Sequence, residues 1–372
     1  MLEITNLRDG AILNRHHGVE TPEGLKIVVE GIADPQAEVK VNGRTASRRD
    51  RNFSAEVVLT RRINKITAEA SDYYGERSLT LTVMWDKASF KRYNFFFDDC
   101  VFCMRSIAVN RPASIFDEMF LKRLKSIHEK YGTRFMLNLF FHDDHHRDFS
   151  LSDFPEDYKA EFQANSDWLK FSFHAKSEFP DRPYQHADSA KMAADFDEIY
   201  REVCRFAGAE CFIPPLVFHW AMTNPENFQV LKERGTRCLA GGFIGTIAAI
   251  GEKHSVEVTD IGYHYEKDVA IYVAKAAHMM YDRKYDLILH SNLTCCNYDD
   301  IPELRRKFAA LEPDRDFVGL MTHEQYTYAD YFNYIPNHLQ RIECACRCAT
   351  EAGYRPVYFA EHMFGNDAWG AK

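Results

Sequence analysis

The stretch Asn94-Phe95-Phe96-Phe97-Asp98-Asp99 decides the fold of this chain. Three consecutive aromatic residues before a pair of acids predict a buried strand that ends by presenting two carboxylates at the edge of a sheet. Adjacent carboxylates repel each other unless a cation or a shared proton offsets their charge. The alternative interpretation is an Asp-Asp turn after a core strand, and the neighbouring segments have to distinguish the two.

From about residue 90 onward, apolar strands alternate with amphipathic helices. Residues 135–141 form a continuous apolar strand, and residues 115–131 carry a helical apolar face that ends before Gly132. Residues 211–213, 237–240 and 270–273 are predicted as further short strands. Repeated strand–helix units predict an α/β fold with a parallel sheet, either doubly wound or closed as a barrel. In both cases the chemistry gathers at the carboxyl ends of the strands.

Residues 1–87 show a different pattern, in which short alternating strands are separated by turn residues. Val39-Lys40-Val41-Asn42-Gly43 ends in Asn-Gly, which is a strong hairpin signal. Closely spaced short strands predict an antiparallel β-sandwich. This strand, together with Gly31-Ile32-Ala33-Asp34-Pro35 and Asn64-Lys65-Ile66-Thr67-Ala68, resembles bacterial Ig-like modules. We therefore expect a small all-β Ig-like sandwich over 1–87, acting as a spacer or packing partner, before an α/β domain over 88–372.

Composition and charge exclude several classes of protein. The net charge of −9 argues against a nucleic-acid-binding protein, which usually shows a basic patch or stripe. No apolar run approaches the roughly 18 residues of a membrane span. The N-terminus, Met1-Leu2-Glu3-Ile4, lacks the character of a leader, which predicts a cytoplasmic protein, or a secreted one if a leader has been removed. The ten cysteines make a poor disulfide framework and are expected to be reduced. Nothing in the sequence indicates an oligomer, although one is not excluded.

Acids and imidazoles follow nearly every predicted strand of the 88–372 domain. Because the carboxyl ends of parallel strands meet at one edge of a sheet, these side chains are expected to form a catalytic or metal site. The residues concerned are Asp98, Asp99, His142, His174, His219, His290 and His323.

Three of these strand ends resemble motifs of the polysaccharide deacetylase-like (NodB-homology, carbohydrate esterase 4-like) family. They are Phe96-Phe97-Asp98-Asp99-Cys100, Phe173-His174-Ala175-Lys176-Ser177-Glu178 and Val318-Gly319-Leu320-Met321-Thr322-His323. The resemblance covers roughly residues 93–362 and implies an irregular (β/α) barrel related to the TIM barrel, with an insertion near 245–315. The chain departs from the family at Glu178, where a second histidine is usual, and at Pro214-Pro215, where the usual arginine is absent.

The resemblance implies a metal-dependent hydrolase that removes an acyl group, in the first instance N-acetyl, from a carbohydrate. Asp98 is then the general base, Asp99 and His174 are metal ligands, and His323 is the acid. The third ligand stays open between His219, the better zinc ligand by type, and Glu178, which has the family's spacing. We expect Zn²⁺, which accepts a carboxylate and imidazoles and keeps a position open for water.

Further residues near the strand ends are candidate contacts to an oligosaccharide or polysaccharide substrate. They are Arg182, Tyr184, Trp220, His290 and Glu324. Two alternatives remain from the sequence. The chain could be a carbohydrate-binding protein that kept the barrel and lost the chemistry, or a metal-dependent hydrolase of another C–N bond or of a glycosidic bond.

Overall fold

The contacts within the computed structural model, which describes residues 1–249 and 252–370, divide the chain into two units. The first unit comprises Met1–Ser89, Met279–Leu289 and Asn366–Lys372, and the second comprises Phe90–His278 and His290–Gly365. The sequence places the boundary after residue 87, close to Ser89. It does not predict that two later segments belong to the first unit.

Two sheets make up the N-terminal part of the first unit. One has the strand order β1-β4-β8-β7 with β3 beside β4, and the other has the order β2-β10-β9-β5-β6. Inward-facing apolar residues of both sheets, such as Val29 and Ile66, form one buried core. The bounds are β1 Leu2–Ile4, β2 Ile12–Leu13, β3 Val19–Thr21, β4 Gly24–Ala33, β5 Glu38–Val41, β6 Arg44–Thr45, β7 Ser47–Arg49, β8 Asn52–Leu59, β9 Ile63–Asp72 and β10 Gly75–Trp85.

A glycine lets the later segment Met279–Leu289 join this unit. The backbone N–H of Tyr281 donates to the carbonyl of Gly10 over 2.8 Å. Gly10 has a φ of +83°, and a Cβ atom there would lie 2.4 Å from the carbonyl oxygen of Tyr281. Position 10 therefore requires glycine, both for its conformation and for the close approach of the two backbones.

A six-stranded parallel sheet is the framework of the second unit. Its order is β13-β12-β11-β20-β19, with β21 beside β11. The strands are β11 Arg92–Cys100, β12 Phe135–Phe140, β13 Leu169–Ala175, β19 Thr294–Cys295, β20 Phe317–His323 and β21 Arg355–Pro356. Every residue of β11 and β12 is buried, as the continuous apolar runs predict. The α/β prediction is confirmed.

This sheet is open, and the described strands do not close it into a barrel. Beyond β13, the backbone hydrogen bonds that extend this sheet among the described residues are isolated ones: Ile213 N–H to the Phe171 carbonyl, His219 N–H to the His174 carbonyl and Ala240 N–H to the Leu216 carbonyl. The strand predicted at 211–213 is reduced to one bridge, between Phe171 and Phe212. Pro214 and Pro215 follow directly and have no N–H to donate, so a regular ladder cannot extend past them.

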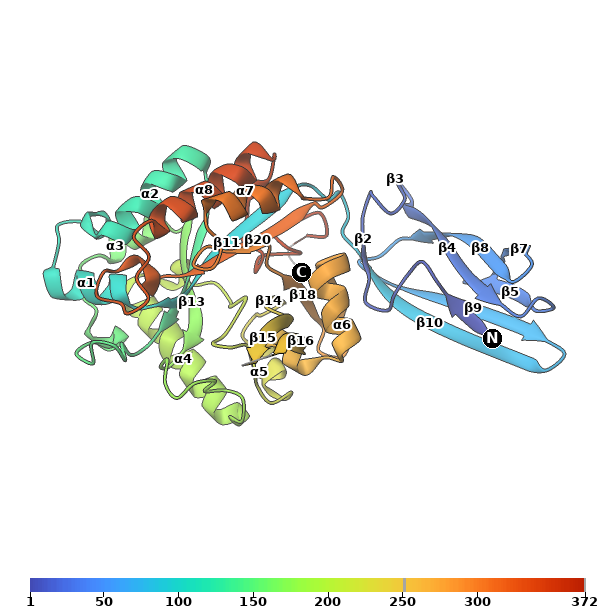
Figure 1. Cartoon of the computed structure of the whole chain (residues 1–372), viewed down its shortest axis with the longest axis horizontal. Helices are drawn as coiled ribbons and strands as arrows, with labels where there is room; N and C mark the ends of the chain where they lie inside the picture. The colour runs from blue at the N-terminus through green and yellow to red at the C-terminus, as the bar shows by residue number, and fades with distance from the viewer. Residues whose placement is uncertain (250–251, 371–372) are drawn as a thin grey trace. The chain divides into compact units, whose positions relative to one another are not determined.

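The helices of the second unit begin and end at ordinary sequence signals. Asp188 and Asp300 cap α4 and α7, and Gly132, with a φ of 69°, ends α2. Helix α2 begins at Met119, later than predicted, because residues 115–117 form a separate 3₁₀ turn. Figure 1 shows α2 and α7 on either side of α8. The bounds are α1 Phe102–Asn110, α2 Met119–Tyr131, α3 Lys159–Gln163, α4 Ser189–Phe206, α5 Asn227–Glu233, α6 Lys267–Tyr272, α7 Ile301–Ala309 and α8 His338–Glu351. No helix in the described part of the chain is long and apolar enough to cross a membrane.

The stretch 245–315, predicted as an insertion, contains several short elements. Besides α6, β19 and α7, the elements in or next to it are β14 Cys238–Gly241, β15 Ile244–Ala249, β16 Glu252–Val258, β17 Met279–Asp282 and β18 Leu287–Ser291. Residues 250 and 251 lie outside the described residues. The strand predicted at 270–273 is wrong, because these residues lie in α6 and the π-helical turn that follows it. Four apolar residues in a row do not distinguish a strand from a helical turn.

Candidate metal centre and cleft

The pair Asp98-Asp99 stands at the carboxyl end of β11, where the predicted site lies. The register of β11 and β20 pairs Asp98 with His323 directly across the sheet. The pairing of β11 with β12 shifts between Phe97 and Cys100, and Asp99 has a φ of 58°. This left-handed conformation is costly for a residue other than glycine, and such strain is typical of functional sites.

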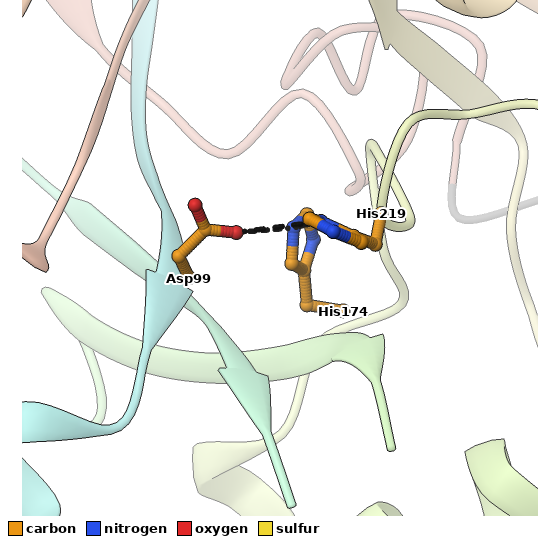
Figure 2. A group of neighbouring side chains, drawn as sticks. All are labelled: Asp99, His174 and His219. Atoms are coloured by element: carbon orange, nitrogen blue, oxygen red, sulfur yellow. Dashed lines mark hydrogen bonds and ion pairs between the residues drawn. The ribbon is translucent and has the colours of Figure 1, made fainter. Parts of the chain in front are cut away.

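Three side chains from separate segments converge beside this strand end, and Figure 2 shows them as Asp99, His174 and His219. His174 Nε2 lies 3.1 Å from Asp99 Oδ1, and His219 Nδ1 lies 3.2 Å from His174 Nε2 and 3.4 Å from Asp99 Oδ1. All three residues are buried. We call them the metal cluster.

The spacing of these three atoms fits a divalent cation. Ligand atoms about 2.1 Å from a zinc ion are separated from each other by about 3.0 Å at right angles and by about 3.4 Å at tetrahedral angles. The three observed separations span the same range. The outer nitrogens, His174 Nδ1 and His219 Nε2, are buried without a hydrogen-bond partner in the described structure. Of these, His174 Nδ1 lies 3.7 Å from Asp98 Oδ1, which is the side where a ligating histidine usually meets a carboxylate. The convergence of three ligand-type atoms on one point is what resembles a ligand set.

The geometry favours His219 over Glu178 as the third ligand. The backbone N–H of His219 donates to the His174 carbonyl over 3.0 Å, which places the two imidazoles side by side. Trp220 and Ala221 follow with φ values of 63° and 49°, so the chain turns sharply after the histidine. Glu178 lines the same cleft but is not a member of the metal cluster.

The two aspartates have opposite electrostatic environments although they are adjacent. Burial raises the pKa of Asp98 to about 7, while His323 and a 2.7 Å hydrogen bond from Asn138 Nδ2 to Asp98 Oδ1 oppose that rise. Burial would also raise the pKa of Asp99, but the charge of His323 and the hydrogen bonds from His174 and His219 outweigh it and hold the pKa well below its usual range. Asp99 is therefore the carboxylate that stays ionised, and Asp98 the one able to accept a proton near neutral pH.

His323 faces the metal cluster from β20. Its Nε2 lies 3.9 Å from Asp99 Oδ2, and its Nδ1 donates to Asn297 Oδ1 over 3.0 Å. Asn297 Oδ1 also accepts hydrogen bonds from Cys295 Sγ and Thr322 Oγ1. These three hydrogen bonds to one oxygen hold the Asn297 amide in place. The amide in turn holds the His323 imidazole so that Nε2 faces Asp99.

The metal cluster opens into a cleft of about 1060 Å³. Asp98, Asp99, His174, His219 and His323 all line it. Of the predicted substrate contacts, only Trp220 lines it. The indole N–H of Trp220 donates to Asp181 Oδ1 over 3.1 Å, and the Arg182 guanidinium lies 5.0 Å from the ring centre. Arg182 itself is exposed and lies outside the lining.

Three other predicted substrate contacts are buried in structural roles. Tyr184 donates to Asp195 and accepts from the backbone of Lys176. His290 is fully buried against Phe317, Phe359 and Phe364, and burial lowers its pKa to about 3. Neither residue lines the cleft.

Glu324 is the third, and its carboxylate caps α1. It accepts hydrogen bonds from the backbone N–H groups of Val101, Phe102 and Cys103, at 2.8, 3.0 and 2.7 Å. The N-terminus of a helix leaves such N–H groups without intrahelical partners and favours a negative charge. Glu324 therefore fastens the segment that follows Asp98-Asp99 to the end of β20, and it is not among the residues that line the cleft.

A second polar group holds the loops beside the cleft, and we call it the Glu178 cluster. His145 Nε2 and Gln325 Nε2 both donate to Glu178 Oε2, over 2.7 and 2.8 Å. The neighbouring His146 contacts Asp143 and Asp330 through its two ring nitrogens. Residues 142–146, which follow β12, thus bind to loops that follow β13 and β20.

The sequence does not predict two residues of the candidate site, Asn138 and Asn297. Asn138 is the one polar residue inside the apolar strand Phe135–Phe140, which is the signal that could have found it. Asn297 stands in a stretch without any motif, and no sequence signal indicates it.

Comparisons with known proteins do not assign this chain to a family. Neither the protein-family models nor the curated proteins match this chain. Among solved structures, one match is an engineered protein that is 18% identical to this chain. The match covers 23% of this chain and 20% of the engineered protein, with a TM-score of 0.17. A Bacteroides fragilis protein described as an alpha-galactosidase is 10% identical, covering 94% and 78%, with a TM-score of 0.25. A Bacteroides ovatus xyloglucanase in complex with a heptasaccharide is 10% identical, covering 90% and 75%, with a TM-score of 0.22. The match thus spans a fifth of the length of the engineered protein. Because all three TM-scores are 0.25 or lower, we draw no conclusion about fold or function from these structures.

Proposed function

We propose that this protein is a metal-dependent hydrolase that removes an acyl group, N-acetyl in the first instance, from a carbohydrate. The observation that carries the proposal is the convergence of Asp99 Oδ1, His174 Nε2 and His219 Nδ1 within 3.4 Å of one another at the floor of a cleft. The proposed proton acceptor, Asp98, and the proposed proton donor, His323, line the same cleft, 3.7 Å from His174 Nδ1 and 3.9 Å from Asp99 Oδ2 respectively. The polysaccharide deacetylase resemblance of three strand ends supports the same reaction.

The metal cluster is the proposed ligand set for Zn²⁺. A divalent cation held there would supply Lewis-acid chemistry, lowering the pKa of a water molecule and polarising the scissile carbonyl. Two imidazoles and a carboxylate also hold Fe²⁺ in redox enzymes. Asp98 and His323, which move protons rather than electrons, favour hydrolysis over redox chemistry.

The chain's own residues would move two protons. Asp98 accepts the proton of the attacking water, and Asn138 keeps the Asp98 carboxylate in place by its hydrogen bond to Oδ1. His323 donates a proton from Nε2 to the departing amine nitrogen, and Asn297 holds the opposite ring nitrogen. Acetic acid and a free amine result, the acid releases its proton to solvent as acetate, and the proton on Asp98 returns to His323 through solvent.

The proposal extends to the fold of both units. We propose that the second unit is a distorted (β/α) barrel of the deacetylase type, in which the single hydrogen bonds beyond β13 replace regular strand pairing. The two N-terminal sheets would be an Ig-like sandwich. The position of Asp98-Asp99 at the carboxyl end of β11 and of His323 at the carboxyl end of the neighbouring β20 supports this proposal for the fold.

Acetate release from N-acetylglucosamine oligomers tests the proposal. The purified protein should contain about one metal ion per chain, lose activity with a chelator and regain it with Zn²⁺. Asp98→Asn should lower kcat by about 10²- to 10⁴-fold while the metal stays bound. Asp157→Asn, the same chemical change at an exposed ion pair with Arg111, is the matched control. If no metal binds, or if Asp98→Asn leaves the rate unchanged, the proposed reaction is wrong.

A further inference from the structure

Negative charge dominates the walls of the cleft. The carboxylates among its described lining residues are Asp98, Asp99, Glu178, Asp181, Asp260 and Asp299. Lys307 is the only lysine or arginine among the described lining residues. A divalent cation on the metal cluster and Lys307 would together supply three positive charges, fewer than six ionised carboxylates carry, so the cleft stays negative above neutral pH. A cleft lined by one sign of charge focuses the field and repels ligands of the same sign.

Lys307, the lysine among the described lining residues, is already paired with a carboxylate. Lys307 Nζ lies 2.7 Å from Asp299 Oδ2 and also donates to the Leu293 carbonyl over 3.2 Å. The guanidinium of Arg182 lies over the Trp220 ring, outside the lining residues. Binding an acidic sugar through Lys307 would therefore first break its ion pair with Asp299. Among the described lining residues, no lysine or arginine other than Lys307 is present to receive a carboxylate, sulfate or phosphate group.

Aromatic side chains supply the uncharged surface of the same cleft. Trp220 is 37% exposed, and its contacts with Asp181 and Arg182 fix the orientation of its ring. Tyr298 is 76% exposed and also lines the cleft. Aromatic rings of this kind offer an apolar body with a polar edge, which suits the faces of sugar rings. The volume of about 1060 Å³ is at the upper end of about 300–1,000 Å³ that is usual for small-ligand sites, so several sugar units can enter.

Building on the proposed function, we propose that the cleft selects oligomeric glycans without acidic groups and rejects glycans that carry carboxylate, sulfate or phosphate. Uncharged sugar rings are favoured because Lys307 is paired with Asp299, because carboxylates outnumber lysines in the lining, and because Trp220 offers an oriented aromatic ring. Selection arises in binding and does not depend on whether the acyl group is subsequently removed.

A matched pair of tetrasaccharides tests the selection. The neutral ligand is the β-linked N-acetylglucosamine tetramer, and the acidic one is the hyaluronan tetramer, in which every second unit is a glucuronate. Binding is measured by calorimetry at pH 8 with the full, Zn²⁺-loaded chain carrying Asp98→Asn, so that the ligands stay intact. The neutral tetramer should bind about tenfold more tightly at low salt, and the gap should narrow at high salt because ions screen the repulsion.

A charge variant locates the effect in the cleft. Asp299→Asn releases Lys307 and removes one wall charge, so the affinity ratio of neutral to acidic tetramer should fall severalfold. Asp314→Asn makes the same change in net charge at an exposed position and should leave the ratio as it is. The inference is overturned if the hyaluronan tetramer binds as tightly as the neutral one, if neither binds, or if the two variants behave alike.

The same measurements separate this inference from the proposed reaction. If the neutral tetramer is preferred but the wild-type protein releases no acetate, the hydrolase proposal fails and the selection stands. If acetate is released equally fast from both tetramers, and both bind equally well, the hydrolase proposal stands and the selection fails.

Discussion

Two groups of imidazoles and carboxylates stand at strand ends of the second unit, and they differ in how their polar atoms are used. In the metal cluster, three atoms of separate residues converge on one point. In the Glu178 cluster, one carboxylate oxygen already accepts two hydrogen bonds. Both groups carry the residue types of a metal site, but only the first offers a shared point for a cation. Convergence of ligand atoms, rather than residue type, distinguishes the two.

Removing one member of each cluster gives the largest expected contrast. His219→Ala should reduce the bound metal from about one ion per chain to nearly none and lower the hydrolytic rate on the order of 10³-fold, because Lewis-acid stabilisation is worth several kcal/mol. Glu178→Gln should keep the metal. Metal analysis after dialysis measures both. If Glu178→Gln loses the metal and His219→Ala keeps it, the roles assigned to the two clusters are reversed.

Glu324 provides a third kind of buried carboxylate, one used entirely for structure. Glu324→Gln places an amide group against backbone N–H groups that need acceptors, which should cost about 2–3 kcal/mol of unfolding free energy. Glu129→Gln, on the exposed face of α2, should change it by less than about 0.5 kcal/mol. Urea unfolding followed by circular dichroism measures both variants. A substrate-binding role would instead raise KM and leave stability intact.

Asn297 tests whether the orientation of His323 matters. Asn297→Ala should lower kcat by about tenfold with little change in KM, because the imidazole remains but is no longer held in place. Asn297→Asp keeps the acceptor oxygen and replaces a buried amide nitrogen that has no partner, so it should restore most of the rate. If both variants lower kcat and the metal content together, Asn297 supports the metal cluster as a whole.

The sequence predicts the parts of this site that depend on strong local patterns. The run Phe95-Phe96-Phe97 before Asp98-Asp99 predicts β11, and the same rule of polar residues at strand ends finds His174 and His323. It also finds His219, although the strand expected before it is only a bridge.

The remaining parts depend on contacts between distant residues. The capping role of Glu324 requires the N-terminus of α1, more than 200 positions earlier in the chain. Asn297 becomes visible only when β19 and β20 lie side by side. The helix at 270–272 replaces a predicted strand because an apolar run of four residues does not fix its own conformation.

The smallest expected effect concerns the Glu178 cluster. It shows whether the contact between His145 and Glu178 is an ion pair or a neutral hydrogen bond. The hydrogen bond to Glu178 raises the pKa of His145 in the folded state, so folding favours the protonated imidazole. The stabilisation should be fully present below the ordinary histidine pKa of about 6.5 and lost as the pH rises through the folded-state value. His145→Phe keeps a ring against Phe102 and Tyr331 but removes the charge. Compared with the wild type, it should lose about 0.5–1 kcal/mol more stability at pH 5.5 than at pH 9. A difference that does not change with pH would mean that His145 is neutral throughout, and the contrast with the metal cluster would then rest on geometry alone.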